Sequence, residues 1–405
     1  MPFTSIERLP LAETQIRTSR LQGFLNREMP QVSGIFIFSR LNIYYLTGSW
    51  VNGVLWVPSE GEPTLMCRRG IERARLDSPL HQMAEYRSFT QLPEICADFG
   101  TPLGDTLGVE MGGLPWNLGL SLQKRIPATY LPADPLLSRT RAVKTDFELA
   151  KMREAGAKHH LCLYHIIPEC IHPGMNEREI SLQIWNVFLN QGHCGMMRME
   201  NFGEEIFLGH VAAGENANYP SVFNGPVGVK GVHPVIPHMG NQATIWNPEQ
   251  PLIVDCGFCL DGYHSDKTQV YWSSKAHIPE YARKAQDFCL DIQMWIAERL
   301  RPGAIPSELF AACWKRAEKQ GFMEEFMGLG KNKVQFIGHG IGLAIDEHPV
   351  IARGFDAPLE EGMTMALEPK IGISGLGMVG VENTFEITRN GGRCLSGDMF
   401  NPILV

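Results

Sequence analysis

Two aspartates in the second half of the chain lie on either side of a strong reverse-turn signal. Asp255 and Asp266 enclose the dipeptide Asp261-Gly262, which is typical of tight hairpin turns. If the chain folds back about Leu260–Asp261, the two aspartates lie opposite each other on one face of two antiparallel strands. The turn dipeptide is displaced by one residue from that centre, so this pairing would require a bulge.

Two glutamates further along the chain show the same arrangement. Glu368 and Glu382 flank a glycine-rich segment, residues 372–380, which has Gly375 near its centre. A second hairpin about Gly375 would again bring two carboxylates together. Both glutamates have apolar neighbours in the chain, so we expect their side chains to point into the interior. An unpaired carboxylate is costly to bury, and each of them therefore needs a counter-charge.

A histidine between two glycines completes the set of residues that could bind a metal. Gly338 and Gly340 flank His339 and would let the backbone approach a crowded site. Imidazole suits a first-row divalent ion such as manganese, cobalt, zinc or iron. Four carboxylates carry about four negative charges, which two divalent ions would balance, whereas five inward ligands are many for one ion. Two ions about 3.5–4 Å apart lower the pKa of a shared water and supply hydroxide near neutral pH. We therefore predict a two-metal hydrolase with the ligands Asp255, Asp266, His339, Glu368 and Glu382.

The elements that must position these residues form two domains. In the first, residues 12–29 are predicted as a helix, residues 35–38 as a buried strand, and residues 53–67 as a hairpin, which together indicate an α/β domain. A linker is predicted over residues 132–145. The expected domains are therefore residues 1–140 and residues 141–405.

The second domain alternates helices with hairpins rather than with single parallel strands. A helix is predicted over residues 146–167, with Thr145 or Asp146 as its N-cap. The pattern indicates an α+β domain with a curved, mostly antiparallel sheet. Residues 212–242 form a long loop rich in Gly, Pro and Asn, and loops of that length are usually functional. Further helices are predicted over residues 177–191, 280–301 and 307–320, and strands near residues 205–213, 243–255, 263–272, 363–371 and 379–388.

Composition argues against several classes of function. The 405 residues carry a net charge of −8 with a pI of about 5.9, which argues against nucleic acid because phosphate binding needs a basic face. No apolar run resembles a signal peptide or a membrane span, so no membrane partner is expected. The ten cysteines suggest no disulfide framework, and a cytoplasmic location is predicted. Cys256 and Cys259 are interpreted as ordinary buried thiols.

The motifs around the five predicted ligands closely resemble those of the pita-bread metalloenzymes, peptidase family M24. The branch that matches best contains the prolidases, the Xaa-Pro aminopeptidases and the creatinases. The segments from Asn42 to Gly48 and from Arg141 to Arg153 resemble the family's N-terminal domain and its interdomain helix. The matching metal motifs are Asp255-Cys256-Gly257, Gly262-Tyr263-His264-Ser265-Asp266, Gly338 to Gly342, Glu368-Pro369 and Glu382.

This resemblance implies a fold, a reaction and roles for single residues. The implied fold is a creatinase/prolidase-like N-terminal domain followed by a pita-bread catalytic domain. The implied enzyme is a homodimeric metallopeptidase that cleaves Xaa-Pro dipeptides or N-terminal Xaa-Pro bonds with a hydroxide bridging two ions, most simply manganese. Glu368 is the expected proton carrier. His238, seventeen residues before Asp255, is the expected substrate-binding histidine, and His233 is its rival. The resemblance assigns one ion to Asp266, His339 and Glu368, the other to Asp255, and a bridging role to Glu382.

Two positions depart from the family's pattern. Asp346 stands where the peptidases carry a proton-shuttling histidine, and His348 could substitute for it from the same strand face. The family's Arg after the second metal aspartate is Gln269 here, although Thr268 can still donate a hydrogen bond. These departures favour an alternative, a small-molecule lyase or amidinohydrolase similar to the dimethylsulfoniopropionate lyases or the creatinases. A non-catalytic binding scaffold is a third reading, but such relatives tend to lose ligands.

Overall fold

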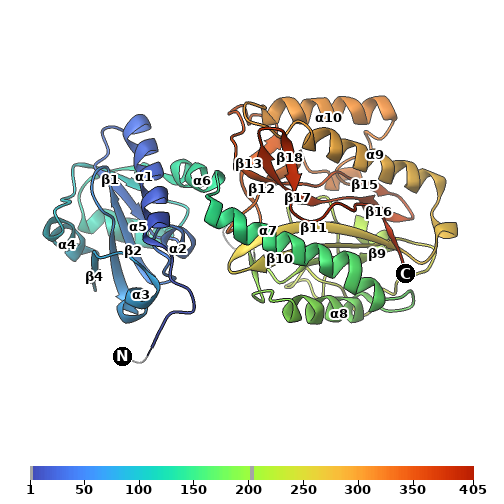
Figure 1. The fold of residues 1–405 in the computed structure, drawn as a ribbon, viewed down its shortest axis with the longest axis horizontal. Coiled ribbons are helices and arrows are strands. Elements are labelled where there is room, and N and C mark those ends of the chain that lie inside the picture. The colour runs from blue at the N-terminus through green and yellow to red at the C-terminus, as the bar shows by residue number, and fades with distance from the viewer. Residues whose placement is uncertain (1–2, 201–204) are drawn as a thin grey trace. The chain divides into compact units, whose positions relative to one another are not determined.

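The computed structural model describes residues 3–200 and 205–405, which form two compact units (Figure 1). The first unit ends at Arg141 and the second begins at Ala142. The boundary expected from the sequence lies one residue earlier. Within the described residues, no helix combines the length and the apolar character that a membrane span requires.

The first unit is built on one mixed sheet with the strand order β4-β3-β2-β1-β5-β6. β1 and β2 pair antiparallel, as do β2 and β3, which confirms the predicted hairpin, and β5 lies parallel to β1. The strands are β1 Gly34–Ile37, β2 Asn52–Pro58, β3 Thr64–Arg69, β4 Met83–Glu85, β5 Thr106–Val109 and β6 Thr129–Pro132. The helices are α1 Leu11–Glu28, α2 Arg40–Thr47, α3 Ile71–Asp77, α4 Leu92–Asp98, α5 Trp116–Arg125 and α6 Asp134–Ala142.

The linker predicted over residues 132–145 is wrong, because most of it is the helix α6. Its prolines, Pro132 and Pro135, are typical of a linker. Instead, Pro135 falls in the first turn of α6, where its missing N–H would have no partner within the helix in any case.

The second unit contains a four-stranded sheet, β19-β11-β10-β9, and a five-stranded sheet, β13-β12-β14-β17-β18. All pairings are antiparallel except that of β11 with β19, which agrees with the predicted architecture. Two hairpins, β7–β8 and β15–β16, complete it. Its strands are β7 Met197–Arg198, β8 Glu205–Ile206, β9 Gly209–Ala213, β10 Leu252–Leu260, β11 Tyr263–Trp272, β12 Phe336–Gly340, β13 Glu347–Ala352, β14 Thr364–Leu367, β15 Lys370–Ile373, β16 Gly377–Gly380, β17 Asn383–Thr388, β18 Gly391–Cys394 and β19 Ile403–Leu404.

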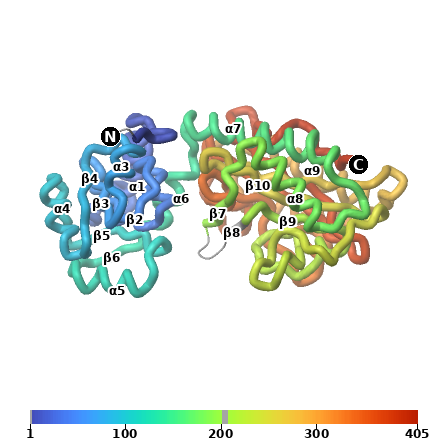
Figure 2. Tube along the Cα trace, turned by 90° about the horizontal axis from the view of Figure 1, so that it is seen from below, coloured from blue at the N-terminus to red at the C-terminus, as the bar shows by residue number. Residues whose placement is uncertain are grey.

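Helices cover the strands of the second unit on two sides. These helices are α7 Asp146–His160, α8 Glu177–Asn190, α9 Glu280–Ala297 and α10 Pro306–Gln320. Figure 1 shows α7 and α8 on one side of the strands and α9 and α10 on the other, and in Figure 2 α8 lies beside β9. A capping box between Thr145 and Glu148 begins α7, as predicted, and α7 continues as a π-helix, Leu161–Ile166. Two apolar clusters form the core of the second unit, and Cys256 and Cys259 are both buried.

The strand predicted over residues 243–255 begins only at Leu252. Pro248 and Pro251 lie just before β10, and proline cannot donate a hydrogen bond to a strand neighbour. Residues 219–242, most of the predicted long loop, contain neither a helix nor a strand, whereas Gly214–Asn218 forms a short 3-10 helix.

The hairpin of β10 and β11 sets the position of both aspartates. Its turn is Asp261-Gly262, with φ of 49° and 86°, and Leu260 pairs directly with Tyr263. Asp255 therefore pairs with Thr268, and Asp266 pairs with Gly257. The prediction that the aspartates lie directly opposite each other is wrong by two residues, and no bulge is needed. They lie diagonally on the same face of the sheet, still within reach of a shared ligand.

Replacing Gly262 by alanine tests this turn. An added Cβ would meet only Leu343 Cδ2 at an ordinary 3.6 Å, so the strain comes from the left-handed backbone alone. We expect Gly262→Ala to lower the free energy of unfolding by about 1–2 kcal/mol in a urea titration. Gly225→Ala is the control, since its Cβ would enter open space, and it should change stability by less than about 0.5 kcal/mol. Equal effects of both substitutions would contradict this assignment of the turn.

Candidate metal centre

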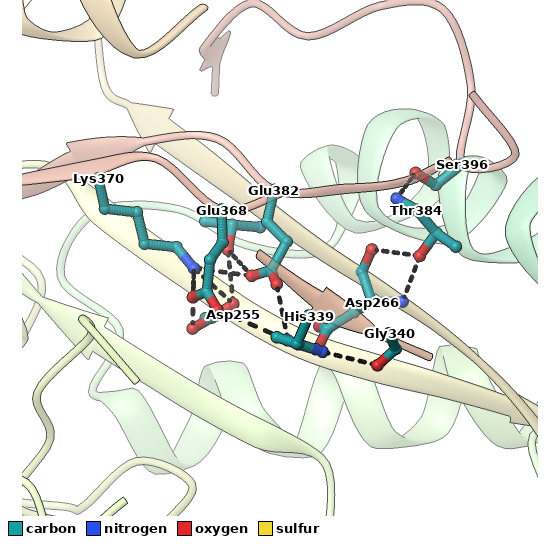
Figure 3. Close-up of polar contacts among 10 residues, drawn as sticks. Asp255, Asp266, His339, Gly340, Glu368, Lys370, Glu382, Thr384 and Ser396 are labelled. Atoms are coloured by element: carbon teal, nitrogen blue, oxygen red, sulfur yellow. Dashed lines mark hydrogen bonds and ion pairs between the residues drawn. The ribbon is translucent and has the colours of Figure 1, made fainter. Parts of the chain in front are cut away.

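The five predicted ligands come together in the second unit, as Figure 3 shows. Asp255, Asp266 and His339 project from neighbouring segments of β10, β11 and β12. Glu368 directly follows β14, and Glu382 directly precedes β17. All but Asp255, which is half-buried, are buried. The structure therefore brings the five residues together, whereas metal binding by them stays a prediction.

The two glutamates face each other because two short ladders share one register. Leu367 pairs with Asn383 in the β14–β17 ladder, and Lys370 pairs with Gly380 in the β15–β16 hairpin. Glu368 and Glu382 lie between these pairs at matching positions. The predicted hairpin about Gly375, which has φ of 76°, is confirmed.

His339 is held with one ring nitrogen turned toward the carboxylates. A Cβ on Gly338 would lie 2.3 Å from Ala366 O, and one on Gly340 would lie 2.4 Å from His348 O. Both glycines are therefore required by the close approach of neighbouring strands, as predicted. Nδ1 of His339 donates to Gly340 O at 3.0 Å, which leaves the Nε2 lone pair facing the cluster.

One side of the cluster has the donor set of a divalent ion. His339 Nε2 lies 3.5 Å from Glu368 Oε1 and 3.9 Å from Glu382 Oε1. Ligand atoms of Asp266, His339 and Glu382 all lie within 4.8 Å of one another. The donor set of one imidazole and two carboxylates suits a first-row divalent ion. Burial, followed by the charge of Asp255, raises the pKa of Asp266 well above its usual range, which indicates excess negative charge.

The other side of the cluster is occupied by a residue that sequence analysis did not single out. The ammonium of Lys370 lies 2.7 Å from Glu382 Oε2, 3.0 Å from Glu368 Oε2 and 3.5 Å from Asp255. Burial alone would lower the pKa of Lys370, but the three carboxylates outweigh it and raise the pKa. Burial alone would likewise raise the pKa of Asp255, but Lys370 holds it at about 2.

Thr268 ties the two halves of the site together. Its hydroxyl lies 2.5 Å from Asp255 Oδ1 and 3.0 Å from Glu382 Oε2, and its N–H donates to Glu382 O at 3.2 Å. The predicted hydrogen-bonding role of Thr268 is thereby confirmed. A single hydroxyl cannot donate to both carboxylates at once, so it can stabilise the charge of only one of them at a time.

Two histidines border the site on the Asp255 side. His238 is half-buried, and its ring lies 5.8 Å from that of Phe223, which in turn lies 5.2 Å from the ring of His210. His210 is the cross-strand partner of Asp255, and burial lowers its pKa to about 4. His210 could not be singled out from the sequence, because a lone histidine in a predicted strand carries no motif. The rival residue His233 lies in an exposed turn.

Asp346 and His348 have different surroundings. Oδ1 of Asp346 accepts the N–H of Glu200 at 2.8 Å. Burial raises the pKa of Asp346 to about 6, although the nearby His339 opposes the rise. The ring of His348 lies 6.0 Å from that of Phe355. Asp346 is therefore the better placed of the two to act beside His339, and a catalytic role for either stays a prediction.

Replacing Asp266 by asparagine tests whether the metal-free site buries excess negative charge. A carboxyl whose pKa is raised by folding stabilises the fold below about pH 4 and loses that contribution as the pH rises through its folded-state pKa. Metal-free Asp266→Asn should therefore melt above the wild type at about pH 8, by roughly 2–4 °C for each kcal/mol of relieved repulsion. The difference should shrink toward about pH 4.

With manganese present, the wild type should melt above Asp266→Asn, because the ion should stabilise the wild type and not the variant. Asp291→Asn, on the exposed side of α9, is the matched control and should follow the wild type. A metal-free Asp266→Asn that melts below the wild type at every pH would contradict the excess of charge.

Comparisons with known proteins agree with this geometry. The model for metallopeptidase family M24 matches residues 150–389, and that for the creatinase/prolidase N-terminal domain matches residues 17–143. The Xaa-Pro dipeptidase of Pyrococcus furiosus is 24% identical over 383 residues, 94% of this chain and 97% of the relative. That of Lactobacillus delbrueckii subsp. lactis is 29% identical over 291 residues, 70% and 68% of the two chains.

A solved structure shows the same fold over both units. The Xaa-Pro dipeptidase from Bacillus anthracis superposes with a TM-score of 0.80 at 20% identity and covers 97% of this chain and 100% of its own. The M24 model alone spans more than half of the 405 residues. The chain therefore belongs to metallopeptidase family M24.

Proposed function

We propose that this protein is a metal-dependent peptidase that cleaves Xaa-Pro dipeptides or N-terminal Xaa-Pro bonds. The observation that carries the proposal is the buried group of Asp266, His339 and Glu382, whose ligand atoms converge within 4.8 Å. Full-length similarity to proteins named Xaa-Pro dipeptidase supports the substrate class. Manganese is the proposed ion, and a homodimer is the proposed assembly.

The proposed chemistry needs few residues besides the ligands. A divalent ion at this site would polarise the scissile carbonyl and lower the pKa of a water. Glu368, with Oε1 turned toward His339, would accept a proton and return it to the leaving amine. Burial raises the pKa of Asp346 to about 6, so a larger fraction of it would be protonated near neutral pH than of an ordinary aspartate, and that form could donate its proton to the substrate carbonyl. His238 would bind the substrate from the Asp255 side.

The number of ions can be counted separately from the activity. In the two-ion form expected from the sequence, Asp255 and both glutamates would hold a second ion, and Lys370 would have to leave their oxygens. In a one-ion form, Lys370 would stay and supply the second positive charge. Both forms leave the proposed reaction unchanged.

The peptidase proposal predicts metal-dependent cleavage. Purified protein with manganese or cobalt should hydrolyse a panel of Xaa-Pro dipeptides, measured by release of free proline, and a chelator should abolish the hydrolysis. His339→Ala should lower kcat/KM by more than about 100-fold, because a metal ligand is lost. His172→Ala, at an exposed loop position, is the control and should retain activity. An intact panel with metal bound would refute the peptidase activity and leave the metal site standing.

His238 should affect substrate binding without affecting the metal. Loss of one hydrogen bond to a charged substrate group typically corresponds to about 10–100-fold in kcat/KM. We expect His238→Ala to show that loss with an unchanged metal content, and His233→Ala to behave as the wild type. A reduced metal content in His238→Ala, or equal losses in the two variants, would contradict the assigned role.

A small-molecule reaction at the same site is a second candidate. The observation in its favour is Asp346, which stands beside His339 where a peptidase histidine was expected. Incubation of the metal-loaded protein with dimethylsulfoniopropionate and with creatine, followed by product detection, separates this candidate from the peptidase.

A further inference from the structure

The side chain of Lys370 fills the half of the metal centre that faces Asp255. Its ammonium lies 2.7 Å from Glu382 Oε2 and 3.0 Å from Glu368 Oε2. Both oxygens of Asp255 lie 3.5 Å from the same nitrogen. The side chain is completely buried, so these contacts belong to the packed interior and not to a mobile surface lysine.

The two glutamates divide their oxygens between His339 and Lys370. Oε1 of each faces His339 Nε2, at 3.5 Å for Glu368 and 3.9 Å for Glu382. Oε2 of each faces the Lys370 ammonium. Figure 3 shows Lys370 and His339 at opposite sides of the glutamate pair. A carboxylate that bridges two metal ions divides its two oxygens in the same way. Here the ammonium of Lys370 holds the position of one of those ions.

A second divalent ion cannot share this position with Lys370. Such an ion would lie about 2.0–2.2 Å from the oxygens that bind it. The oxygens available to it are those of Asp255 and the two Oε2 atoms, all of which already surround the ammonium. An ion at that distance from them would overlap the nitrogen and repel its charge.

The backbone fixes Lys370 in place. It begins β15 and pairs with Gly380, where an added Cβ would come within 2.7 Å of Lys370 Cα. Gln286 of α9 bonds both the N–H and the carbonyl of Gly380, at 2.9 and 3.1 Å. The strand pair that carries the ammonium is thus tied to the helix layer behind it.

We propose that this protein binds a single divalent ion, at Asp266, His339 and the Oε1 atoms of the two glutamates, and that the Lys370 ammonium replaces the second ion. Asp255 is then the partner of Lys370 and not a metal ligand. This inference rests on the metal dependence proposed above and departs from the two-ion form expected from the sequence. Lys370 acts through the carboxylates that it holds, so it is a positioning residue.

Metal content tests the inference without reference to activity. The full-length protein is dialysed to equilibrium against manganese, and bound metal per chain is measured by elemental analysis. The wild type should bind about one ion, and its electron paramagnetic resonance spectrum should show an isolated ion without coupling to a second. Lys370→Ala should bind two ions that are magnetically coupled. Lys144→Met, which removes another buried lysine, paired with Glu347, is the matched control and should bind one.

A pair of aspartate variants tests the inference if Lys370→Ala does not fold. Asp255→Asn should retain one ion with an affinity within about tenfold of the wild type, whereas Asp266→Asn should lose the ion. Two coupled ions in the wild type, or loss of metal in Asp255→Asn, would overturn the inference. A folded Lys370→Ala with a single ion would overturn it as well.

The outcomes separate the two proposals. Two ions together with Xaa-Pro cleavage would refute the role of Lys370 and leave the peptidase standing. One ion without cleavage of any peptide would refute the peptidase and leave the role of Lys370 standing. A protein that binds no ion under these conditions would refute both.

Discussion

The structure of the second unit depends on keeping four carboxylates together in a space with little access to water. Two unit charges 4 Å apart interact by about 4 kcal/mol at an effective dielectric constant of 20. Asp255, Asp266, Glu368 and Glu382 repel one another on that scale, and in the described chain Lys370 is the cation in direct contact with three of them. Burial and these charges raise the pKa of both Asp266 and Glu382. The fold must therefore supply rigidity, and a bound cation must supply the missing charge.

Rigidity comes from strand registers that leave the acidic residues few alternatives. The Asp261-Gly262 turn sets β10 against β11, and one continuous register aligns Glu368 with Glu382. Thr268 joins the two pairs through its backbone bridge to Glu382. A slip of one residue in either ladder would turn a carboxylate to the opposite face. Turn glycines that bind no metal therefore still determine the geometry of the metal centre.

Features that depend on neighbouring residues in the chain could be predicted from the sequence, whereas features that depend on the pairing of strands could not. Turn dipeptides, the glycines around His339 and the apolar neighbours of Glu368 are local features, and they indicated all five converging residues. The diagonal offset of Asp255 and Asp266 depends on which residue closes the turn, and the pattern left that one residue in doubt. Lys370 follows Glu368-Pro369 and resembles any solvated lysine in the sequence. Its burial arises only when β15 pairs with β16 under α9.

A buried carboxylate elsewhere in the same unit shows why a complete set of donors matters. Glu177, in the first turn of α8, accepts the N–H of Ala213, the side-chain amide of Asn216, and both the N–H and the side-chain amide of Asn241. These bonds hold both ends of the segment that carries Phe223 and His238, so the loop beside Asp255 is anchored.

Among the residues that the structure describes, the carboxylate of Asp266 has no comparable set of donors. It faces Asp255 and Glu368, and the N–H of Lys267 is the backbone donor to its carboxylate. Glu177 shows that this fold can surround a buried carboxylate with amide donors where the role is structural. The contrast supports a functional reading of the centre: the negative charge that Lys370 does not balance lies on the His339 side, where a bound divalent ion would complete the set.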